Sequence, residues 1–177
     1  MAFPDVTTTE RLRLSRWEPE LYTATLEGIN AQPDAVLFLN AGVPYTPAET
    51  SAQSERFAAH WATHGFGLWG ASLLDTGEVI GFVGVAHPLW FGAYAHEVEI
   101  GWRLHPSFWR QGYATEAGRA AVSAASEHLE LERLIAVIDP LNFPSIGVAT
   151  RLGFTLDEAV PHPQRAGEIG IWARKLP

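Results

Sequence analysis

Residues 100–116 of the 177-residue chain read IGWRLHPSFWRQGYATE, and this stretch decides the fold. A strand pattern ends at Leu104, a short loop follows, and a helix is predicted to begin near Gly112. The first amides of a helix lack internal partners, and the helix dipole is positive at that end. Gly112 and the small Ala114 would also let a phosphate come close to the backbone. The junction therefore predicts an anion-binding site, with an ordinary connecting loop as the alternative.

Local charge supports the anion-binding interpretation. Between positions 103 and 119 lie Arg103, Arg110 and Arg119 against the single acid Glu116. The whole chain has 12 Lys and Arg against 20 Asp and Glu, a net charge of −8. This balance argues against a nucleic acid or an anionic membrane surface as partner. A phosphate-bearing small ligand at the junction is consistent with the local charge.

Composition narrows the class of protein further. An apolar fraction of 47% with 18% charged residues is typical of a folded globular domain, and 177 residues favour a single domain over 1–177. The absence of cysteine excludes disulfides and a cysteine nucleophile. The start of the sequence shows no secretion-signal pattern, and no run of about 18 apolar residues occurs. We therefore expect a cytoplasmic protein.

The elements around the deciding stretch alternate between antiparallel-type strands and helices. Asp75-Thr76-Gly77 is favourable hairpin chemistry between two apolar runs. A capping box at Thr46–Glu49 begins a helix, and Asn142 caps another. Strands are predicted at 11–17, 67–75, 78–86, 96–104, 133–138, 154–159 and 168–174, and helices at 19–29, 33–39, 47–63, 113–129 and 142–153. This order indicates an α+β (mixed α/β) fold rather than a doubly wound one.

Four motifs in register resemble the GNAT acetyltransferase superfamily. Residues 109–114, WRQGYA, are similar to its acetyl-CoA pyrophosphate-binding motif Q/R-x-x-G-x-G/A, with Trp in place of the first Gln or Arg. Residues 112–117, GYATEA, resemble the branch of ribosomal-protein N-terminal acetyltransferases, although Arg110 stands where that branch has its first Gly. The other three are TERLRL at 9–14, EIGW at 99–102, and NFPS at 142–145 followed by LGF at 152–154. The resemblance covers nearly the whole chain.

The resemblance implies a fold and a cofactor. The fold is a central, mostly antiparallel twisted sheet with a splayed parallel strand pair, here 96–104 and 133–138, flanked by helices. Acetyl-CoA would lie in the splay as a co-substrate, with its pantetheine arm on the backbone of Trp102 and Leu104. Its phosphates would contact the loop residues Trp109, Arg110, Gln111, Gly112, Tyr113 and Ala114, with Thr115 and Asn142 as further contacts.

The implied reaction is acetyl transfer to a primary amine, such as a protein N-terminal α-amine. Glu99 is the first candidate for general base and Glu97 the second, since a β-bulge in this strand could reorient one of them. Many relatives carry a Tyr as general acid at the position of Ala149. We expect Ser145 to replace it as a donor to the departing sulfur. Because no cysteine is present, direct attack in a ternary complex is the expected mechanism.

Two other functions stay open at this stage. The acceptor could be a small-molecule amine such as an amino acid, a polyamine or an antibiotic, or the chain could be a non-catalytic acyl-CoA-binding module. Dimers are frequent in the family, which leaves a homodimer open. His60 and His64 have metal-ligand spacing, but no third ligand is evident and no metal is expected. An aromatic acceptor groove is predicted from residues 61, 66, 69, 90, 91 and 94, with core packing as the alternative for about half of them. The loop at 90–94 is interpreted as a wall of the acceptor site or a dimer contact.

Overall fold

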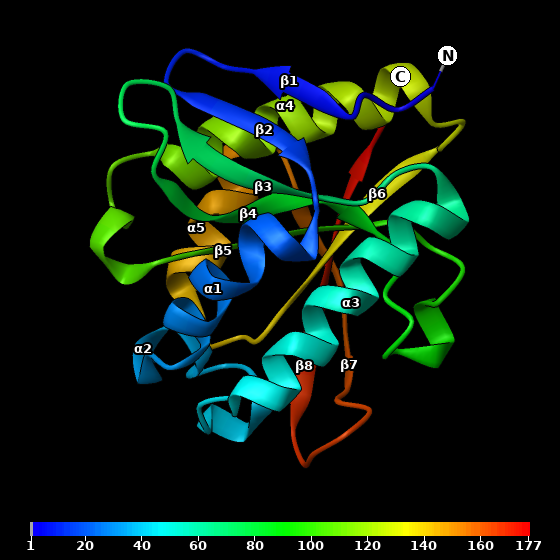
Figure 1. The fold of residues 1–177 in the computed structure, drawn as a ribbon. Helices are drawn as coiled ribbons and strands as arrows, with labels where there is room; N and C mark the ends of the chain where they lie inside the picture. Colours follow the sequence, from blue (N-terminus) through cyan, green and yellow to red (C-terminus); the bar gives the residue numbers. More distant parts are fainter. Residues whose placement is uncertain (1) are drawn as a thin grey trace.

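The computed structural model describes residues 2–177 as an eight-stranded sheet flanked by helices (Figure 1). The strand order is β1-β2-β3-β4-β5-β6-β8-β7, and every neighbouring pair is antiparallel except β5 and β6. The strands are β1 (Val6–Thr8), β2 (Leu12–Arg16), β3 (Leu68–Leu73), β4 (Val79–Ala86), β5 (Glu99–Leu104), β6 (Arg133–Ile138), β7 (Thr155–Pro161) and β8 (Glu168–Lys175). The α+β fold class predicted from the sequence is confirmed.

The helices begin and end where local sequence signals lie. In the helix that begins at Pro47, the Thr46 hydroxyl accepts from the Glu49 N–H, and the Glu49 carboxylate accepts from the Thr46 N–H. That helix ends before Gly65, which has a φ of 73°. The α-helices are α1 (Pro19–Asn30), α2 (Pro33–Val36), α3 (Pro47–His64), α4 (Tyr113–His128) and α5 (Phe143–Arg151), with 3₁₀ turns η1 (Asn40–Gly42), η2 (Gly92–Tyr94) and η3 (Pro106–Phe108).

Three details differ from the sequence prediction. Strand β1 was not predicted, because three residues carry too little periodicity and its pairing with β2 supplies the missing hydrogen bonds. The strand predicted at 96–104 begins only at Glu99, because the chain bends at 95–97 after η2. The β-bulge that could have reoriented Glu97 or Glu99 is not seen in the pairing of β5 with β4, and a register shift occurs between β3 and β4, where Ile80 is the extra residue.

The parallel strands β5 and β6 touch only at one end. The single register pair joins Glu99 to Ile135, and the Ile135 N–H donates to the Val98 carbonyl at 3.0 Å. Beyond this point the strands separate, so the remaining backbone groups at the facing edge of β5 have no strand partner. The splayed pair predicted from the sequence is confirmed.

Helices cover both faces of the sheet, with α1 and α3 on one face and α4 on the other (Figure 1). A Cβ at Gly70 of β3 would meet the Tyr22 ring of α1 at 2.4 Å, so Gly70 points to the face of the sheet that α1 covers, here called the α1 face. Phe82 of β4 lies opposite Gly70, and Arg103 of β5 lies opposite Phe82. Facing residues of paired strands share one face, so Arg103 also lies on the α1 face.

The two helices that follow β5 and β6 pack against each other. A Cβ at Gly118 of α4 would meet the Leu152 side chain, just past α5, at 2.6 Å, so this close contact requires glycine. Because β5 and β6 are parallel, their carboxyl ends and the helix N-termini that follow them lie at the same end of the sheet. No helix within residues 2–177 is both long and apolar enough to span a membrane.

Candidate functional site

The edge of β5 that faces away from β4 presents the backbone groups of every second residue to the gap between β5 and β6, here called the splay. The backbone N–H of His105 donates to the Ile80 carbonyl at 2.9 Å. In this register the odd-numbered residues of β5 form the backbone hydrogen bonds to β4. Trp102 and Leu104 therefore direct their backbone groups toward the open side, as the sequence predicts for a pantetheine contact. The Leu104 carbonyl, however, already accepts from the Trp109 indole at 2.8 Å. Only its N–H is left for a ligand.

The predicted phosphate loop has an unusual backbone. Arg110 has a φ of 61° and Gly112 a φ of 86°, both in the left-handed region. Gly112 is also the N-cap of α4 and provides no side-chain cap to the first amides of the helix. These amides remain available to an anion. Figure 1 shows this loop joining β5 to α4.

A charged brace holds this loop against the start of the chain. The Glu116 carboxylate of α4 accepts from the Thr9 hydroxyl at 2.5 Å, the Arg11 N–H at 2.8 Å and the Arg11 Nε at 2.7 Å. Arg11 also donates to the Gln111 carbonyl at 3.0 Å, and its guanidinium lies 4.4 Å from the centre of the Tyr113 ring. The motif residues at 9–11 and at 116 are thus one structural unit. Sequence reasoning treated them separately.

The remaining predicted cofactor contacts lie around the start of α5. Asn142 caps this helix, because its side-chain oxygen accepts from the Ser145 N–H at 3.2 Å. Ser145 is partly buried, and its hydroxyl has no hydrogen-bond partner within residues 2–177. The Thr115 hydroxyl is buried and accepts from the Arg151 Nε at 3.2 Å. Thr115 therefore links α4 to α5 instead of presenting a free hydroxyl to the loop.

Glu99 lies where β5 and β6 begin to separate. Burial raises the pKa of Glu99 to about 7, and hydrogen bonds from the Val137 N–H and the Trp90 indole oppose this rise. Val137 belongs to β6, so its N–H points into the splay. A carboxylate with this pKa exchanges a proton readily near neutral pH.

Glu97 is placed differently from its neighbour. It lies outside β5, and its carboxylate accepts from the Arg133 Nη2 at 2.6 Å and Nε at 3.2 Å. Arg133 also pairs with Asp157 at 2.9 Å. The structure thus gives Glu97 an ion-pair partner at the base of β6, away from the free edge of β5.

The predicted aromatic groove is largely wrong. Trp61, Phe66 and Trp69 are buried in the main core and Phe91 in a smaller cluster with β6 and β8, whereas Trp90 is 42% exposed. The structure therefore leaves Trp90 at the splay and places the other large rings in packing roles.

His60 and His64 are joined by a third histidine. The His60 and His64 rings lie 4.4 Å apart, and the His87 ring is 4.8 Å from His64. The backbone N–H of His87 donates to His60 Nε2 at 2.9 Å, so that ring nitrogen is already occupied. Across residues 2–177 no three His, Asp or Glu side chains are arranged to hold a metal ion.

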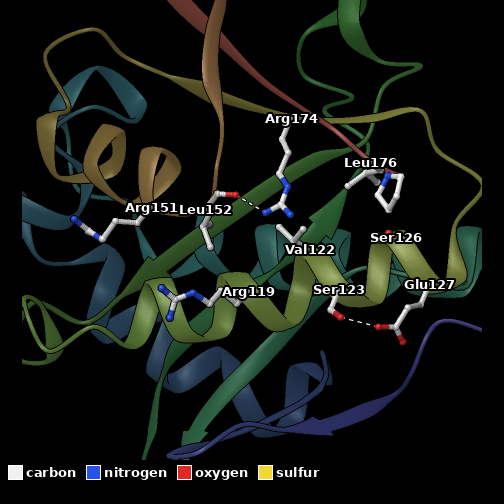
Figure 2. A pocket seen from close by; sticks show the side chains of 10 residues that line it. Arg119, Val122, Ser123, Ser126, Glu127, Arg151, Leu152, Arg174 and Leu176 are labelled. Atoms are coloured by element: carbon white, nitrogen blue, oxygen red, sulfur yellow. Dashed lines mark hydrogen bonds between the residues drawn. The ribbon is translucent and has the colours of Figure 1, made fainter.

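A separate pocket of about 430 Å³ lies between α4 and the C-terminal ends of α5 and β8 (Figure 2). Figure 2 shows Arg174 reaching to the Leu152 carbonyl and Ser123 bonded to Glu127. None of the residues predicted to bind the cofactor or to act in catalysis lines this pocket. Its lining is Arg119, Val122, Ser123, Ser126, Glu127, Arg151, Leu152, Arg174, Leu176 and Pro177.

The sequence of this chain matches a known protein family. The family profile described as "Acetyltransferase (GNAT) domain" matches residues 11–155. The chain therefore belongs to the GNAT acetyltransferase family, a family of acyltransferases that use acetyl-CoA.

Individual relatives agree with this assignment. The FsC-acetyl coenzyme A-N(2)-transacetylase of Aspergillus fumigatus is 30% identical over 159 residues, 78% of this chain and 66% of that protein. An acetyltransferase from Agrobacterium tumefaciens is 30% identical, with a TM-score of 0.82 over 98% of this chain and 95% of that one. The ribosomal L7/L12 alpha-N-protein acetyltransferase RimL, solved with coenzyme A, shares the fold at 18% identity (TM-score 0.72, 99% and 98% covered). The chain matches from 34% to 66% of the length of its curated relatives.

Proposed function

We propose that this protein transfers the acetyl group of acetyl-CoA to a primary amine by direct attack in a ternary complex. The observation that carries the proposal is the Glu99 carboxylate in the splay, with a pKa of about 7. An α-amine has a pKa of about 8, so a base of this strength can take its proton at neutral pH. Membership in the GNAT family supports the choice of acetyl-CoA as donor.

Cofactor binding is proposed to use the groups left free around the splay. The pantetheine arm would contact the backbone of Trp102 and the Leu104 N–H. The diphosphate would bind the uncapped amides at Arg110 to Ala114, where the positive end of α4 favours an anion. Trp109 would act indirectly, since its indole holds the Leu104 carbonyl. Gln111 would likewise contribute backbone, because its side chain donates to the Ser107 carbonyl.

Beside the thioester, two further residues complete the proposed site. Asn142 orients the first turn of α5, and the unpaired Ser145 hydroxyl would donate to the departing thiolate. A thiol has a pKa of about 8.5, so little proton donation is needed. Most of the catalysis would then come from holding the amine and the thioester together.

The acceptor proposed first is a protein N-terminal α-amine or a similar amine. A small-molecule amine is the second candidate, supported by the 30% identity to the FsC transacetylase. A non-catalytic acyl-CoA sensor is less well supported, because the Glu99 carboxylate lies at the splay instead of pointing away from it. A cytoplasmic location and a homodimer are proposals from composition and family only.

The Glu99→Gln variant tests this assignment. We expect turnover to fall about 10- to 100-fold and the rise of kcat through pH 7 to disappear, with acetyl-CoA affinity unchanged by calorimetry. Free CoA thiol reports the rate without background, because the chain has no cysteine.

Glu97→Gln is the matched control. It removes a carboxylate two residues away and should keep the pH dependence, although it breaks the pair with Arg133. Loss of the pH dependence in Glu97→Gln together with its retention in Glu99→Gln would assign the base to Glu97.

A further inference from the structure

Arg103 carries a positive charge that no carboxylate of the described residues, 2–177, neutralises. Its Nη1 donates to the Asn30 amide oxygen at 2.6 Å and to that of Gln53 at 3.3 Å, and Tyr45 adds a side-chain hydrogen bond. All three partners are uncharged at neutral pH. No Asp or Glu oxygen lies within 4.0 Å of this guanidinium among residues 2–177.

This arrangement is unusual for a desolvated cation. Burial lowers the pKa of Arg103 to about 10, which reports a considerable loss of hydration. Arg11 and Arg133, which are more exposed to solvent, each bind a carboxylate. The C-terminus of α1, at Asn30, has no basic residue in its last turn and offers Arg103 only a partial negative charge. The charge is thus left without a full counter-ion at a site where one would be strongly stabilising.

Arg103 also has the right position for an acceptor contact. Side chains alternate along a strand, so Glu99, Gly101 and Arg103 lie on the same face of β5, the α1 face. A Cβ at Gly101 would meet no atom within 4 Å, so open space separates the carboxylate from the guanidinium. The span between the Cα atoms of Glu99 and Arg103 is about 13 Å in an extended strand.

The guanidinium keeps contact with solvent. Arg103 is partly rather than fully buried. In the described residues, the single buried side-chain nitrogen or oxygen without a partner is His128 Nδ1. The N–H groups of Arg103 not used by Asn30, Gln53 or Tyr45 therefore retain contact with solvent.

We propose that Arg103 binds an anionic group, a carboxylate or a phosphate, of the amine acceptor while the amine lies at Glu99. This names a substrate class for the proposed function and rests on it. The acceptor would approach from the α1 face, cross the open floor at Gly101 and supply the missing counter-ion. Polyamines, which are cationic at neutral pH, and other amine acceptors without an acid group would be poor substrates.

Matched acceptor pairs test the proposal. Wild-type protein is assayed with α- and ω-amino acids against their carboxamides, and with aminoalkyl phosphates against the corresponding alcohols. We expect kcat/KM for the preferred acid to exceed that of its neutral partner about 10- to 100-fold. The carboxylate and phosphate arms show which anion fits.

Arg103→Gln should abolish this preference, mainly by raising KM for the acid, while acetyl-CoA affinity and the rate with the neutral partner change little. Arg103→Lys should retain part of the preference. Arg56→Gln, an exposed residue of α3, removes the same charge and should have no effect. Equal rates for acid and neutral partners in the wild type, or an equal loss of both in Arg103→Gln, would overturn the proposal and leave the proposed function intact.

A binding measurement separates the two hypotheses if no acceptor is acetylated. N-acetylated acids and amides are titrated calorimetrically into CoA-saturated protein. Binding of the acids that is lost in Arg103→Gln, without turnover, would support the anion site and contradict the catalytic function. Neither binding nor turnover would overturn both. Thermal unfolding of each variant shows whether the loss of the Asn30 and Gln53 contacts has altered the fold.

Discussion

At the scale of single residues, Arg110 stands in a backbone conformation that disfavours its side chain. Its φ of 61° costs an ordinary residue about 1 kcal/mol or more relative to glycine. The branch of ribosomal-protein N-terminal acetyltransferases that the motif resembles carries Gly at this position, and Gly adopts a positive φ readily. Nothing in the structure explains why arginine stands here instead. The arginine contributes a positive charge beside the proposed phosphate site, so local strain is kept where a ligand would use the charge.

This strain gives a prediction. Arg110→Gly and Arg110→Ala remove the same charge, but only glycine is favoured at this φ, so Arg110→Gly should be more stable by about 1 kcal/mol. Free energies of unfolding from urea denaturation measure the difference. The same pair at Gln111, whose φ is not positive, should show the reverse order. A more stable Arg110→Ala would mean that the loop relaxes out of the left-handed region.

At the same scale, the sequence predicted local conformation better than long-range partners. The helix start at Gly112 and the helix cap at Asn142 were predictable, because neighbours in sequence set the conformation of both residues. The partner of Glu97 was not predictable, since Arg133 lies 36 residues away and meets it only through the β5–β6 pair. The hydrogen bonds to the Glu99 carboxylate likewise come from Trp90 and Val137, which no local pattern connects to it.

At the scale of elements, the brace between Glu116 and the β1–β2 connection determines where α4 begins. Burial raises the pKa of Glu116, but hydrogen bonds from Thr9 and Arg11 outweigh burial, and the net shift is downward. The ionised carboxylate is therefore the form that holds the brace. Because Arg11 also contacts Gln111 and Tyr113, the brace reaches the phosphate loop directly.

Glu116→Gln should weaken both the fold and the loop. We expect a loss of about 1 to 2 kcal/mol in the free energy of unfolding, since the charge-assisted bonds of a partly buried carboxylate to a more exposed arginine are lost. The Kd for acetyl-CoA should rise several-fold, because the loop is held less firmly. Glu127→Gln on the same helix is the control, since that exposed carboxylate bonds only to Ser123 and, weakly, to His128. Equal stability of the two variants would contradict a bracing role.

Elements with strong local signals were predictable, and those that depend on pairing were not. The capping box at Thr46 and the turn at Asp75–Gly77 are short-range features, and the elements that they bound were found within a few residues. Strand β1 exists only because Val6 to Thr8 pair with β2. The true start of β5 depends on the turn at η2, which brings Phe91 into the core beside Ile135.

At the scale of the whole molecule, two partly buried groups, His60 and Glu99, have opposite effects on stability as the pH changes. Burial lowers the pKa of His60 to about 4 from 6.5, helped by His64 and His87 and opposed by the bond to the Phe66 carbonyl. Burial raises the pKa of Glu99 to about 7 from 4.5. In the folded state His60 therefore takes up its proton at a lower pH than in the unfolded chain, whereas Glu99 keeps its proton up to a higher pH.

The signs follow from proton linkage. Between about pH 4 and 6.5 the unfolded chain protonates His60 and the folded chain does not, so stability falls as the pH falls. Between about pH 4.5 and 7 the folded chain protonates Glu99 and the unfolded chain does not, so stability rises as the pH falls. Each slope is at most about 1.4 kcal/mol per pH unit, and the two oppose each other over their shared window of about pH 4.5 to 6.5.

Removing either group should therefore expose the slope of the other. In Glu99→Gln the free energy of unfolding should fall more steeply than in wild type as the pH drops from 6.5 to 4.5. In the same variant, stability should exceed that of wild type above pH 7, because the buried charge is gone. In His60→Gln the stability should fall less with decreasing pH than in wild type. Urea denaturation across this range measures all three chains, and the other titrating groups are shared, so they cancel in the comparison. Parallel curves for wild type and Glu99→Gln would mean that Glu99 takes up its proton at the same pH in the folded and unfolded chains, and the base proposed for the acetyl transfer would then have an ordinary pKa.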